Sequence, residues 1–521
     1  MMGKSLTKRE FLKLLALLSP SIYLSRPFFQ KPDRLLLNPD AKNVLVIVFD
    51  TLSAKNISLY GYPRQTMPNL ARIAEKGTVY HNHYAGGNWT IPGTASLLTG
   101  TYPWTYRAFN DAVRQVAKGT ELHNLFNLFD QYYRVGYSHN GNVYHFFNQF
   151  STDIQEIKDQ AELFIKNNLS LDRLFPQDND IAPITWDRMM DEGEKGYTYS
   201  LFFAPFYQKY SQQIIQNLRS NFPRGLPQTG EDDYFLLEDG INWIISELSA
   251  IQRPFLGYFH FLPPHRPYNT RREFVNMFQN DAVGPYVEKP KHPVFGGDKE
   301  KPLNLKYQSR QRQFYDEFIL YTDSELGRLY DALEQSGVLE NTWLVFTSDH
   351  GEMCERSIFG HRTPVLYQPV IRIPLVILEP GQRARRDIFT STSAVDVVPT
   401  LLKVSGQEIP SWLEGTVLEP FSDVPSVADR SLYALEAIRS DPYGILNPAT
   451  VMLVKGQYKL TYYFGYEEMA ETGPLFELYD IENDPEELKN IYDPNWQIAR
   501  ELGNELLDKV KAVYEPYSKS S

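Results

Sequence analysis

A single hydroxyl stands at the expected start of a helix in the stretch "AGGNWTIPGTASLLTG", residues 85–100. A polar turn leads into Thr90, and Pro92 suits the first turn of a helix. Helix N-termini attract anions through free N–H groups and the helix dipole, so a hydroxyl placed there is suited to attack phosphorus or sulfur. The alternative is that the Thr90 side chain only caps the helix. The choice depends on which other groups the chain brings to the same place.

Three more polar side chains follow two runs rich in β-branched residues. The run "NVLVIVFD" ends at Asp50, and "TWLVFTSDH" ends at Asp349 and His350. Such runs predict strands buried on both faces of a sheet, and ligands bind at the C-terminal ends of parallel strands. Two carboxylates and an imidazole suit one divalent cation, with Mn or Zn favoured, Mg or Ca possible, and Thr90 completing the set. The alternative for "SDHGE" is a turn whose aspartate caps a helix.

Composition limits the class of protein. The 521 residues are enough for one large α/β domain and a smaller one, and the 42% hydrophobic share is typical of a globular chain. The net charge of -12, with no basic stripe, argues against a nucleic-acid partner. Cys354 is the single cysteine, which excludes an intramolecular disulfide and a cysteine-based metal site.

Alternating strand and helix patterns predict an α/β fold over most of the chain. Buried-strand runs alternate with helical segments, such as residues 312–338, across residues 41–408, which we expect to form the catalytic domain. Residues 145–230 have poor periodicity and many aromatic residues, and they predict an insertion of short helices and loops over the active-site edge. Short strand-like segments and a terminal helix in residues 409–521 predict a smaller C-terminal domain with antiparallel strands.

The first 40 residues resemble a targeting segment or anchor and are set aside from the fold. The string "LTKREFLKLL" resembles a twin-arginine export signal in which Lys8 replaces the first arginine. The following apolar stretch is interrupted by Pro20 and is too short to cross a bilayer. We therefore expect an extracytoplasmic protein, in the periplasm or at the cell surface. An uncleaved anchor associated with the membrane, or an ordinary amphipathic helix on a cytoplasmic protein, are the alternatives.

Six strings, in the same order along the chain, resemble the sulfatase family of the alkaline phosphatase superfamily. They are "VFDTLSAKNISLYGYPRQTMPNLARIAEKG", "TASLLTGTYP", "NTWLVFTSDHGE", "RIPLVILEPGQ", "SAVDVVPTLLKVSG" and "LYDIENDPEELKNI". The resemblance covers nearly the whole chain beyond Asn43. It implies an alkaline-phosphatase/sulfatase-like α/β sandwich, with a large mixed central sheet flanked by helices and a smaller C-terminal antiparallel-sheet domain.

The chain departs from the sulfatase pattern at the catalytic string. Sulfatases place a Cys or Ser, converted to formylglycine, at the head of C/S-x-P-x-R, whereas this chain has Thr90 there and Thr94 in place of the arginine. Where sulfatases carry a lysine and a histidine, "YRVGYSHNGN" offers Asn140 and Asn142. Much of the cationic site for a sulfate ester is therefore missing, and Asn140 is the candidate substrate contact.

The expected metal ligands resemble another branch of the same superfamily. An Asp, Thr, Asp, His set, here Asp50, Thr90, Asp349 and His350, is similar to that of the phosphoethanolamine and phosphoglycerol transferases. Those enzymes use a threonine as a covalent nucleophile on one metal, and their substrates are phosphodiesters. They usually carry several membrane spans, which this sequence lacks.

Two loops supply further candidates through the same resemblance. The string "HFLPPHRPY" matches the family's histidine before H-x-P, so His265 is a candidate for protonating the leaving oxygen, or else a loop histidine stacked on prolines. His361 and Arg362 stand where sulfatases keep a lysine, and an arginine suits a bidentate phosphate or sulfate contact. A solvated turn is the alternative for this pair. His260 lies within its strand and is expected in the core.

These residues predict a metal-dependent hydrolase or transferase in which Thr90 attacks a phosphodiester, phosphonate or sulfate ester. Phosphorus is favoured over sulfur because the formylglycine position and the sulfate-binding cations are altered. Two alternatives stay open: a sulfuric ester hydrolase without formylglycine, and a non-catalytic protein that binds a sulfated or phosphorylated glycan or lipid head group. Substrate, acceptor and oligomeric state do not follow from the sequence.

Overall fold

The computed structural model describes residues 41–166, 200–230, 233–281, 289–295, 305–424 and 429–518. The expected targeting segment lies outside these residues, as does part of the expected insertion, so export and membrane association stay predictions. Among the residues that the structure describes, no helix combines the length and hydrophobicity needed to cross a membrane.

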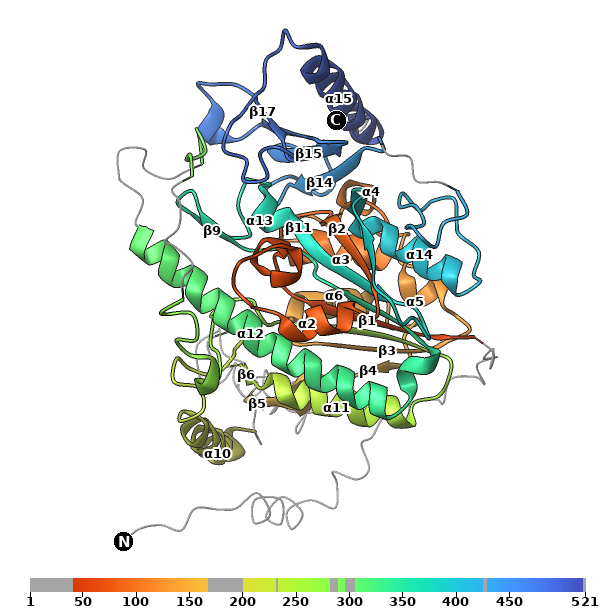
Figure 1. Cartoon of the computed structure of the whole chain (residues 1–521), viewed down its shortest axis with the longest axis vertical. Coiled ribbons are helices and arrows are strands. Elements are labelled where there is room, and N and C mark those ends of the chain that lie inside the picture. Colours follow the sequence, from red (N-terminus) through yellow and green to blue (C-terminus); the bar gives the residue numbers. More distant parts are fainter. Residues whose placement is uncertain are drawn as a thin grey trace, which may run out of the picture.

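A mixed sheet of nine strands forms the centre of the molecule (Figure 1). Its strands are β1 (Asn43–Phe49), β2 (Thr78–Tyr84), β3 (Tyr133–Ser138), β4 (Glu156–Ile157), β7 (Phe255–Phe261), β8 (Thr342–Thr347), β11 (Arg372–Leu378), β12 (Arg386–Ile388) and β13 (Thr392–Ser393). The order is β12-β2-β11-β8-β1-β7-β3-β4, and β13 pairs with β2. The five strands from β8 to β4 are parallel, while β11 runs antiparallel to both of its neighbours. The C-terminal ends of β1, β2, β3, β7 and β8 therefore meet at one edge.

Helices cover both faces of this sheet because alternate residues of its central strands are apolar on both sides. In β1, Leu45 and Ile47 pack toward α2 (Pro68–Ala74), α11 (Leu237–Ala250) and α12 (Leu305–Gln335). Val44 and Val46 pack toward the other layer, which contains α3 (Thr90–Thr99), α5 (Leu125–Leu128), α6 (Gly141–Gln149) and α14 (Val397–Val404). The expected α/β sandwich with a large mixed sheet is confirmed.

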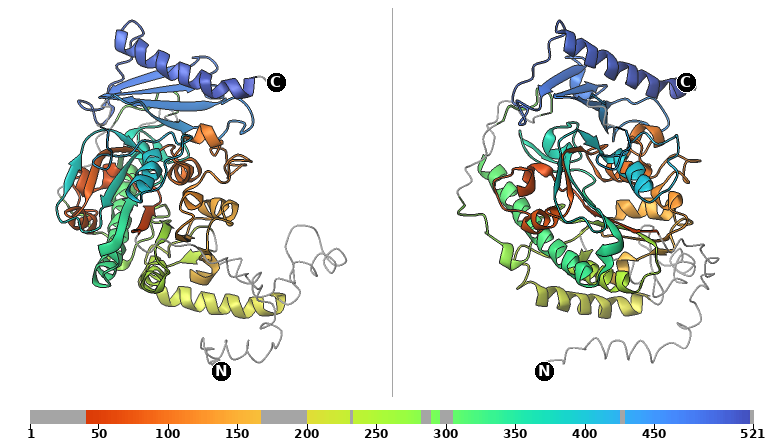
Figure 2. Two further views of the ribbon diagram at one scale, coloured as in Figure 1. Left: turned by 90° about the vertical axis from the view of Figure 1, so that its right-hand side faces the viewer. Right: turned by 45° about the vertical axis from the view of Figure 1, so that its right-hand side comes forward.

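A second sheet, antiparallel and smaller, lies at the C-terminal end of the chain. Its strands are β14 (Leu432–Glu436), β15 (Ala449–Lys455), β16 (Tyr458–Phe464) and β17 (Leu475–Asp480), in that order. One face packs against α15 (Gln497–Ser518) through Leu502 and Leu506. The other face contacts α13 (Gln368–Ile371) through Met452 and Val454. Figure 2 shows α15 on the outer side of this sheet, away from the central sheet.

One expectation about the insertion is wrong in detail. The residues expected to form short helices fold in part as one 19-residue helix, α10 (Ser200–Leu218), at the opposite end of the molecule from α15 (Figures 1 and 2). Further short helices and strands of the described chain, inside and outside the insertion, are α4 (Pro103–Tyr106), α7 (Gln160–Leu163), β5 (Phe164–Lys166), β6 (Tyr234–Phe235), β9 (Met353–Glu355) and β10 (Ile358–Gly360).

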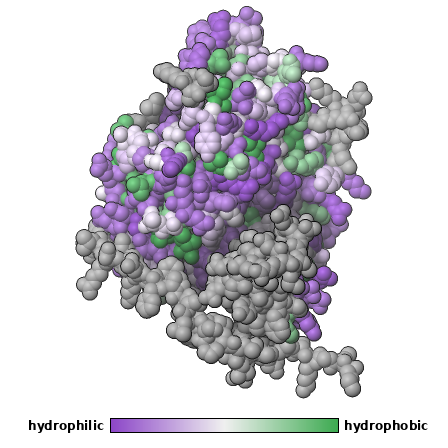
Figure 3. Space-filling view, turned by 180° about the vertical axis from the view of Figure 1, so that it is seen from behind, coloured by the Kyte–Doolittle hydropathy of each residue, from purple (hydrophilic) through white to green (hydrophobic). Residues whose placement is uncertain are grey.

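On the rear face in Figure 3, the described surface is mostly hydrophilic, with hydrophobic residues in small separated groups.

A buried ion pair fastens the small sheet to the rest of the molecule. Lys459 in β16 pairs with Glu487, and each side chain is 1% exposed. The Lys459 ammonium also donates to the Leu366 carbonyl at 2.5 Å, and the Glu487 carboxylate accepts the backbone N–H of Gln368 at 2.8 Å. Because Gln368 begins α13, the pair joins the two parts of the molecule across their interface.

Replacing Lys459 with methionine should loosen the small sheet. The substitution leaves the Glu487 charge buried without its partner, which costs about 3–5 kcal/mol. Hydrogen exchange of the β15 to β17 amides should speed up accordingly. The control is Lys511→Met, which removes an ion pair with both side chains about three-quarters exposed (75% and 74%) and should cost under about 1 kcal/mol. Equal exchange rates in the two variants would show that the buried pair does not stabilise this interface.

Candidate active site

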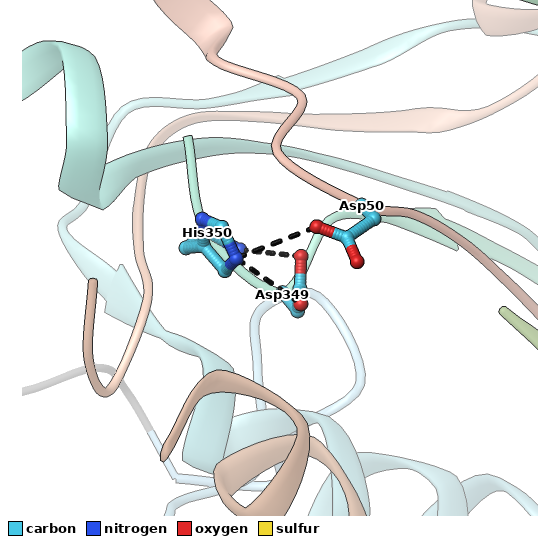
Figure 4. A group of neighbouring side chains, drawn as sticks. All are labelled: Asp50, Asp349 and His350. Atoms are coloured by element: carbon cyan, nitrogen blue, oxygen red, sulfur yellow. Dashed lines mark hydrogen bonds and ion pairs between the residues drawn. The ribbon is translucent and has the colours of Figure 1, made fainter. Parts of the chain in front are cut away.

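The central strands bring three of the predicted ligands together at one edge of the sheet. Asp50 follows β1 directly, and Asp349 and His350 follow the neighbouring parallel strand β8. The His350 Nε2 atom lies 3.4 Å from Asp50 Oδ1 and 3.5 Å from Asp349 Oδ2. All three side chains are fully buried. Figure 4 shows the His350 ring pointing toward both carboxylates.

The His350 ring presents a lone pair to these carboxylates. Its Nδ1 donates to the Gly351 carbonyl at 2.8 Å, which assigns the proton to that nitrogen. Burial, with His361 as a further cause, lowers the pKa of His350 to about 3, so the ring is neutral at physiological pH. A neutral imidazole whose Nδ1–H is held by a carbonyl is the form that binds a metal through Nε2.

The two carboxylates are in electrostatic conflict. Burial opposes the charged form of Asp50, but the neighbouring rings of His260, His265 and His350 outweigh it and hold the pKa of Asp50 below its ordinary value. Burial, and then the charge on Asp50, raise the pKa of Asp349 well above its ordinary value. Asp349 Oδ1 accepts the backbone N–H groups of Thr51 and His350, at 3.3 and 2.9 Å. Asp50 Oδ1 and Asp349 Oδ2 have no hydrogen-bond partner within the described part of the chain.

The geometry of these groups fits a single divalent cation. Metal–ligand bonds of about 2.0–2.2 Å in a tetrahedral site place two ligand atoms about 3.4 Å apart. The separations from His350 Nε2 to Asp50 and Asp349, 3.4 and 3.5 Å, match that spacing. A cation there would also satisfy the three buried atoms that lack a partner among the described residues, Asp50 Oδ1, Asp349 Oδ2 and His350 Nε2.

His260 belongs to this site, contrary to its expected place in the core. It is fully buried, as expected, but its Nε2 lies 3.8 Å from Asp50 Oδ2 and 3.6 Å from Asp349 Oδ2. The residue sits in β7, in register with Val48 of β1. Sequence analysis missed it because a buried strand gives no sign of which strand lies beside it. The signal present was a polar residue near the C-terminal end of a strand that is otherwise apolar.

Thr90 is the first residue of α3 and does not cap it. Trp89 occupies the cap position, with no hydrogen bond from its side chain, so the capping alternative is wrong. The Thr90 side chain is nearly buried, and its Oγ1 accepts a hydrogen bond from Asn140 Nδ2 at 3.3 Å. The same nitrogen donates to Asp50 Oδ2 at 2.5 Å. One amide group therefore connects the candidate nucleophile to a candidate metal ligand.

Asn140 is fixed in this bridging position by a second helix. Its side-chain oxygen accepts the backbone N–H of Asn142 at 2.8 Å and caps the N-terminus of α6. The amide has no freedom to rotate without losing the cap. Asn142, the other candidate, points elsewhere and accepts from Arg114 at 3.1 Å. The predicted substrate contact thus lies inside the site, where it orients other residues.

Glycines allow the helix carrying Thr90 to approach the loop that carries Asp349. A Cβ atom on Gly93 would lie 2.3 Å from the Asp349 carbonyl oxygen, and one on Gly86 would lie 2.0 Å from Ser96 Oγ. The Gly86 carbonyl also accepts the backbone N–H of Leu435 in β14 at 2.9 Å. The small sheet and α3 therefore both contact the turn before Thr90.

Two histidines stand on the other side of His350. The His361 ring centre is 4.5 Å from that of His350 and 5.0 Å from that of His265. His361 Nδ1 lies 3.3 Å from Glu352 Oε1, and burial opposes ionisation of Glu352 while His361 and other neighbours hold its pKa below the ordinary value. His265 Nδ1 donates to the Arg266 carbonyl at 2.6 Å, and burial lowers the pKa of His265. Glu352 is the second site residue that sequence analysis missed.

Arg362 does not join the cluster. Its side chain is 44% exposed and pairs with Asp111 at 2.6 Å. Its guanidinium lies 4.9 Å from the ring centre of Trp89, the residue before Thr90. Thr94, at the position of the sulfatase arginine, is buried in α3, and its hydroxyl has no partner among the described residues. No arginine replaces the missing one at that position.

Comparison with known proteins decides the family. The model of the sulfatase family matches residues 42–407 of the chain. The chain belongs to the sulfatase family. A model of the C-terminal region of N-sulphoglucosamine sulphohydrolase matches residues 354–513 of this sulfatase-family protein.

Relatives of this sulfatase-family chain carry several names. Arylsulfatase K of Bos taurus is 28% identical over 515 residues, which cover 92% of this chain and 85% of the relative. Choline-sulfatase of Rhizobium meliloti is 27% identical over 481 residues, covering 86% and 82%. The crystal structure of a phosphonate monoester hydrolase of Agrobacterium radiobacter superposes with a TM-score of 0.65 at 20% identity, covering 91% of this chain and 96% of that one. The last similarity supports the shared fold.

Removing one carboxylate should abolish metal binding. We expect Mn²⁺ or Zn²⁺ added to metal-free wild type to raise its melting temperature, because a ligand that binds only the folded state stabilises it. Asp349→Asn should show no such shift and should lower the metal affinity about 100-fold or more, measured by titration calorimetry. The control is Asp153→Asn, a nearly buried carboxylate that accepts from Asn124 and Asn127 outside the site. Undiminished binding in Asp349→Asn would place the cation elsewhere.

Proposed function

We propose that this sulfatase-family chain is a metal-dependent hydrolase in which the Thr90 hydroxyl attacks the phosphorus or sulfur of a phosphodiester, phosphonate or sulfate ester. The observation that carries the proposal is the Asn140 amide, which donates to both Thr90 and Asp50. The attack forms a bond from Thr90 Oγ1 to the central atom and breaks the bond to the leaving oxygen. Water, or an acceptor hydroxyl in a transferase, then releases the group from Thr90.

Two features of the protein favour negative charge on the attacking oxygen. The Asn140 N–H donates to Thr90 Oγ1, and a hydrogen bond to the charged form lowers the pKa of a hydroxyl. Thr90 also stands at the N-terminus of a ten-residue helix with no capping side chain, where the helix dipole favours an anion. A divalent cation held by Asp50, Asp349 and His350 would supply Lewis-acid chemistry, since it would lower the pKa of a hydroxyl and neutralise charge on the ester.

The two histidines transfer protons to and from the reacting oxygens. We assign the proton for the leaving oxygen to His361, whose Nδ1 lies 3.3 Å from Glu352 Oε1. His265 keeps its Nδ1 proton on a carbonyl, and burial lowers its pKa, so its Nε2 is a proton acceptor. We assign it to the water or hydroxyl that releases the group from Thr90.

Phosphorus esters rank before sulfate esters as substrates. A threonine cannot give the aldehyde of formylglycine, and Thr94 supplies no charge for a sulfate group. The names of the relatives are compatible with both phosphorus and sulfur esters, since two are sulfatases and one structural neighbour is a phosphonate monoester hydrolase. The three p-nitrophenyl esters, phosphodiester, phosphonate and sulfate, are therefore the substrates to compare.

Replacing Thr90 should abolish both turnover and a covalent adduct. We expect intact mass spectrometry of metal-loaded wild type, after brief incubation with the substrate, to show one added phosphoryl-type group. Thr90→Ala should show none and should lower kcat about 10³-fold or more, whereas Thr90→Ser should keep the adduct. The matched control is Thr99→Ala, which removes a threonine hydroxyl at the other end of the same helix.

Two other results would change the assignment. Turnover of the sulfate ester that survives in Thr90→Ala would show that another group attacks. Metal binding without adduct or turnover on any of the three esters would indicate a non-catalytic protein that binds sulfated or phosphorylated ligands.

A further inference from the structure

A carboxyl group is buried at the end of β14, in the small sheet. Glu436 is the last residue of this strand, and its side chain is buried. Its Oε1 atom accepts the backbone N–H of Ile438 at 3.1 Å. Its Oε2 atom forms a short hydrogen bond with the hydroxyl of Tyr466. None of the ion pairs formed within the described part of the chain includes Glu436.

The surroundings of Glu436 do little to keep it ionised. The titratable groups on the segments next to it are Arg439 in the loop after β14, Tyr466 and Glu468 around the turn η6 (Glu467–Met469), and His361 and Arg362 in the loop after β10. Arg439 is exposed and pairs with Glu468 at 3.2 Å, and Arg362 pairs with Asp111. Burial raises the pKa of Glu436 to about 6, although the Tyr466 hydrogen bond and Arg439 favour the charged form.

A row of four oxygen atoms connects Glu436 to the segment that begins with His361. The Tyr466 hydroxyl, next to Glu436 Oε2, lies 2.8 Å from Thr450 Oγ1. Thr450 in turn donates to the Pro364 carbonyl at 2.6 Å. We term residues 361–364 the His361 loop. The row therefore ties this loop to the interior of the small sheet.

The row needs one proton more than its two hydroxyl groups contain. It has three links, and each link needs one proton between its two oxygens. The Pro364 carbonyl has no proton, while Tyr466 and Thr450 have one each. The third proton must come from Glu436 in its acid form. When Glu436 is ionised, Tyr466 donates to the carboxylate, and Thr450 has a single proton for both the Tyr466 oxygen and the Pro364 carbonyl.

The His361 loop is held from two sides. Thr450 binds its last residue, and Asn88 Nδ2 donates to the Thr363 carbonyl at 2.6 Å. Asn88 lies two residues before Thr90 in the turn at the start of α3. The loop also closes on itself, because the Thr363 N–H donates to the His361 carbonyl at 2.9 Å. A loss of the Thr450 link would leave the loop attached only on the Thr90 side among these contacts.

We propose that Glu436 is a positioning residue, which holds the His361 loop through Tyr466 and Thr450 only while its carboxyl group is protonated. Turnover then weakens as the pH rises and Glu436 loses its proton to the solvent. The inference rests on the proposed function, because the loop affects turnover through His361, the proposed proton donor.

A comparison with Glu436→Gln tests the role of the proton. The side-chain amide of this variant donates to Tyr466 at every pH, so it copies the protonated acid. We expect equal kcat in the two proteins at about pH 5, and a kcat about 5-fold lower in wild type at about pH 8, because one hydrogen bond is lost. The substrate is whichever of the three p-nitrophenyl esters wild type turns over fastest. Taking the ratio at each pH removes the titration of the histidines and the metal ligands, which both proteins share.

Two further variants serve as controls. Thr450→Val keeps the shape of the side chain without its hydroxyl, and it should lower kcat about 5-fold relative to Glu436→Gln at both pH values. Glu477→Gln replaces another buried carboxyl group of the small sheet, which accepts from Tyr463 at 2.8 Å and from Tyr367 at 3.2 Å. The ratio of kcat between wild type and Glu477→Gln should not change with pH.

Infrared spectroscopy detects the proton on Glu436 without any turnover. The difference spectrum between wild type and Glu436→Gln should contain the C=O stretch of a protonated carboxyl group at about pH 5 and lose it by about pH 8. The midpoint should lie at a pH of about 6. If none of the three esters reacts, amide hydrogen exchange of residues 361–366 replaces kcat, and it should be faster in wild type than in Glu436→Gln at about pH 8.

The results separate the inference from the proposed function. A ratio of kcat, or of exchange rates, that stays constant between about pH 5 and about pH 8 would overturn the inference, as would the absence of the infrared band at both pH values. An equal pH dependence of the ratio for Glu477→Gln would overturn it too, because it would indicate a general effect of buried carboxyl groups. Turnover that survives in Thr90→Ala would contradict the proposed nucleophile, while the infrared band and the exchange rates would still decide the role of Glu436.

Discussion

The arrangement of the rest of the site depends on two carboxylates, Asp50 and Asp349, which are buried beside each other. Their repulsion in a buried site must be offset, and the surrounding structure is arranged to do so. Asn140 donates to Asp50, and Thr51 turns its N–H toward Asp349 from a left-handed conformation with φ of 61°. A β-branched residue adopts that conformation only at a cost, so backbone strain is stored next to the candidate metal site. His350, neutral and oriented, completes an arrangement that fits a cation.

Much of the fold and part of the site follow from local sequence. Runs of β-branched residues predict the buried strands, and polar residues after two of them predict the cluster of Asp50, Asp349 and His350, because parallel strands end at one edge. His260 does not follow from that reasoning, since its strand reads as core unless one knows that β7 lies beside β1. Strand order arises from contacts between distant segments, which hydrophobic periodicity does not encode. Sequence analysis missed Glu352 for the same reason.

The arginines show even more clearly that neighbours in the sequence do not determine which side chains meet in the fold. Arg362 follows His361 directly and looked suited to bind an anion, yet it pairs with Asp111 outside the cluster. Arg224 and Arg310 lie far apart in the chain, yet their guanidinium carbons lie 3.7 and 5.1 Å from the ring centre of Phe314. The fold assembles these arginines from separate segments, so the sequence shows no basic stripe. A chain with excess negative charge can thus still bring several arginines together around one cavity.

The hydrogen bond from Leu435 to the Gly86 carbonyl has a consequence for how the enzyme is made. During synthesis the ribosome releases the Thr90 helix long before β14, by a delay on the order of tens of seconds. Until that late strand arrives, the turn that aims the hydroxyl lacks one of its fixed supports. A nascent or C-terminally truncated chain would therefore carry every candidate site residue while lacking this support of the turn before Thr90. The geometry of the turn before Thr90 therefore depends on a strand that lies more than 300 residues further along the chain.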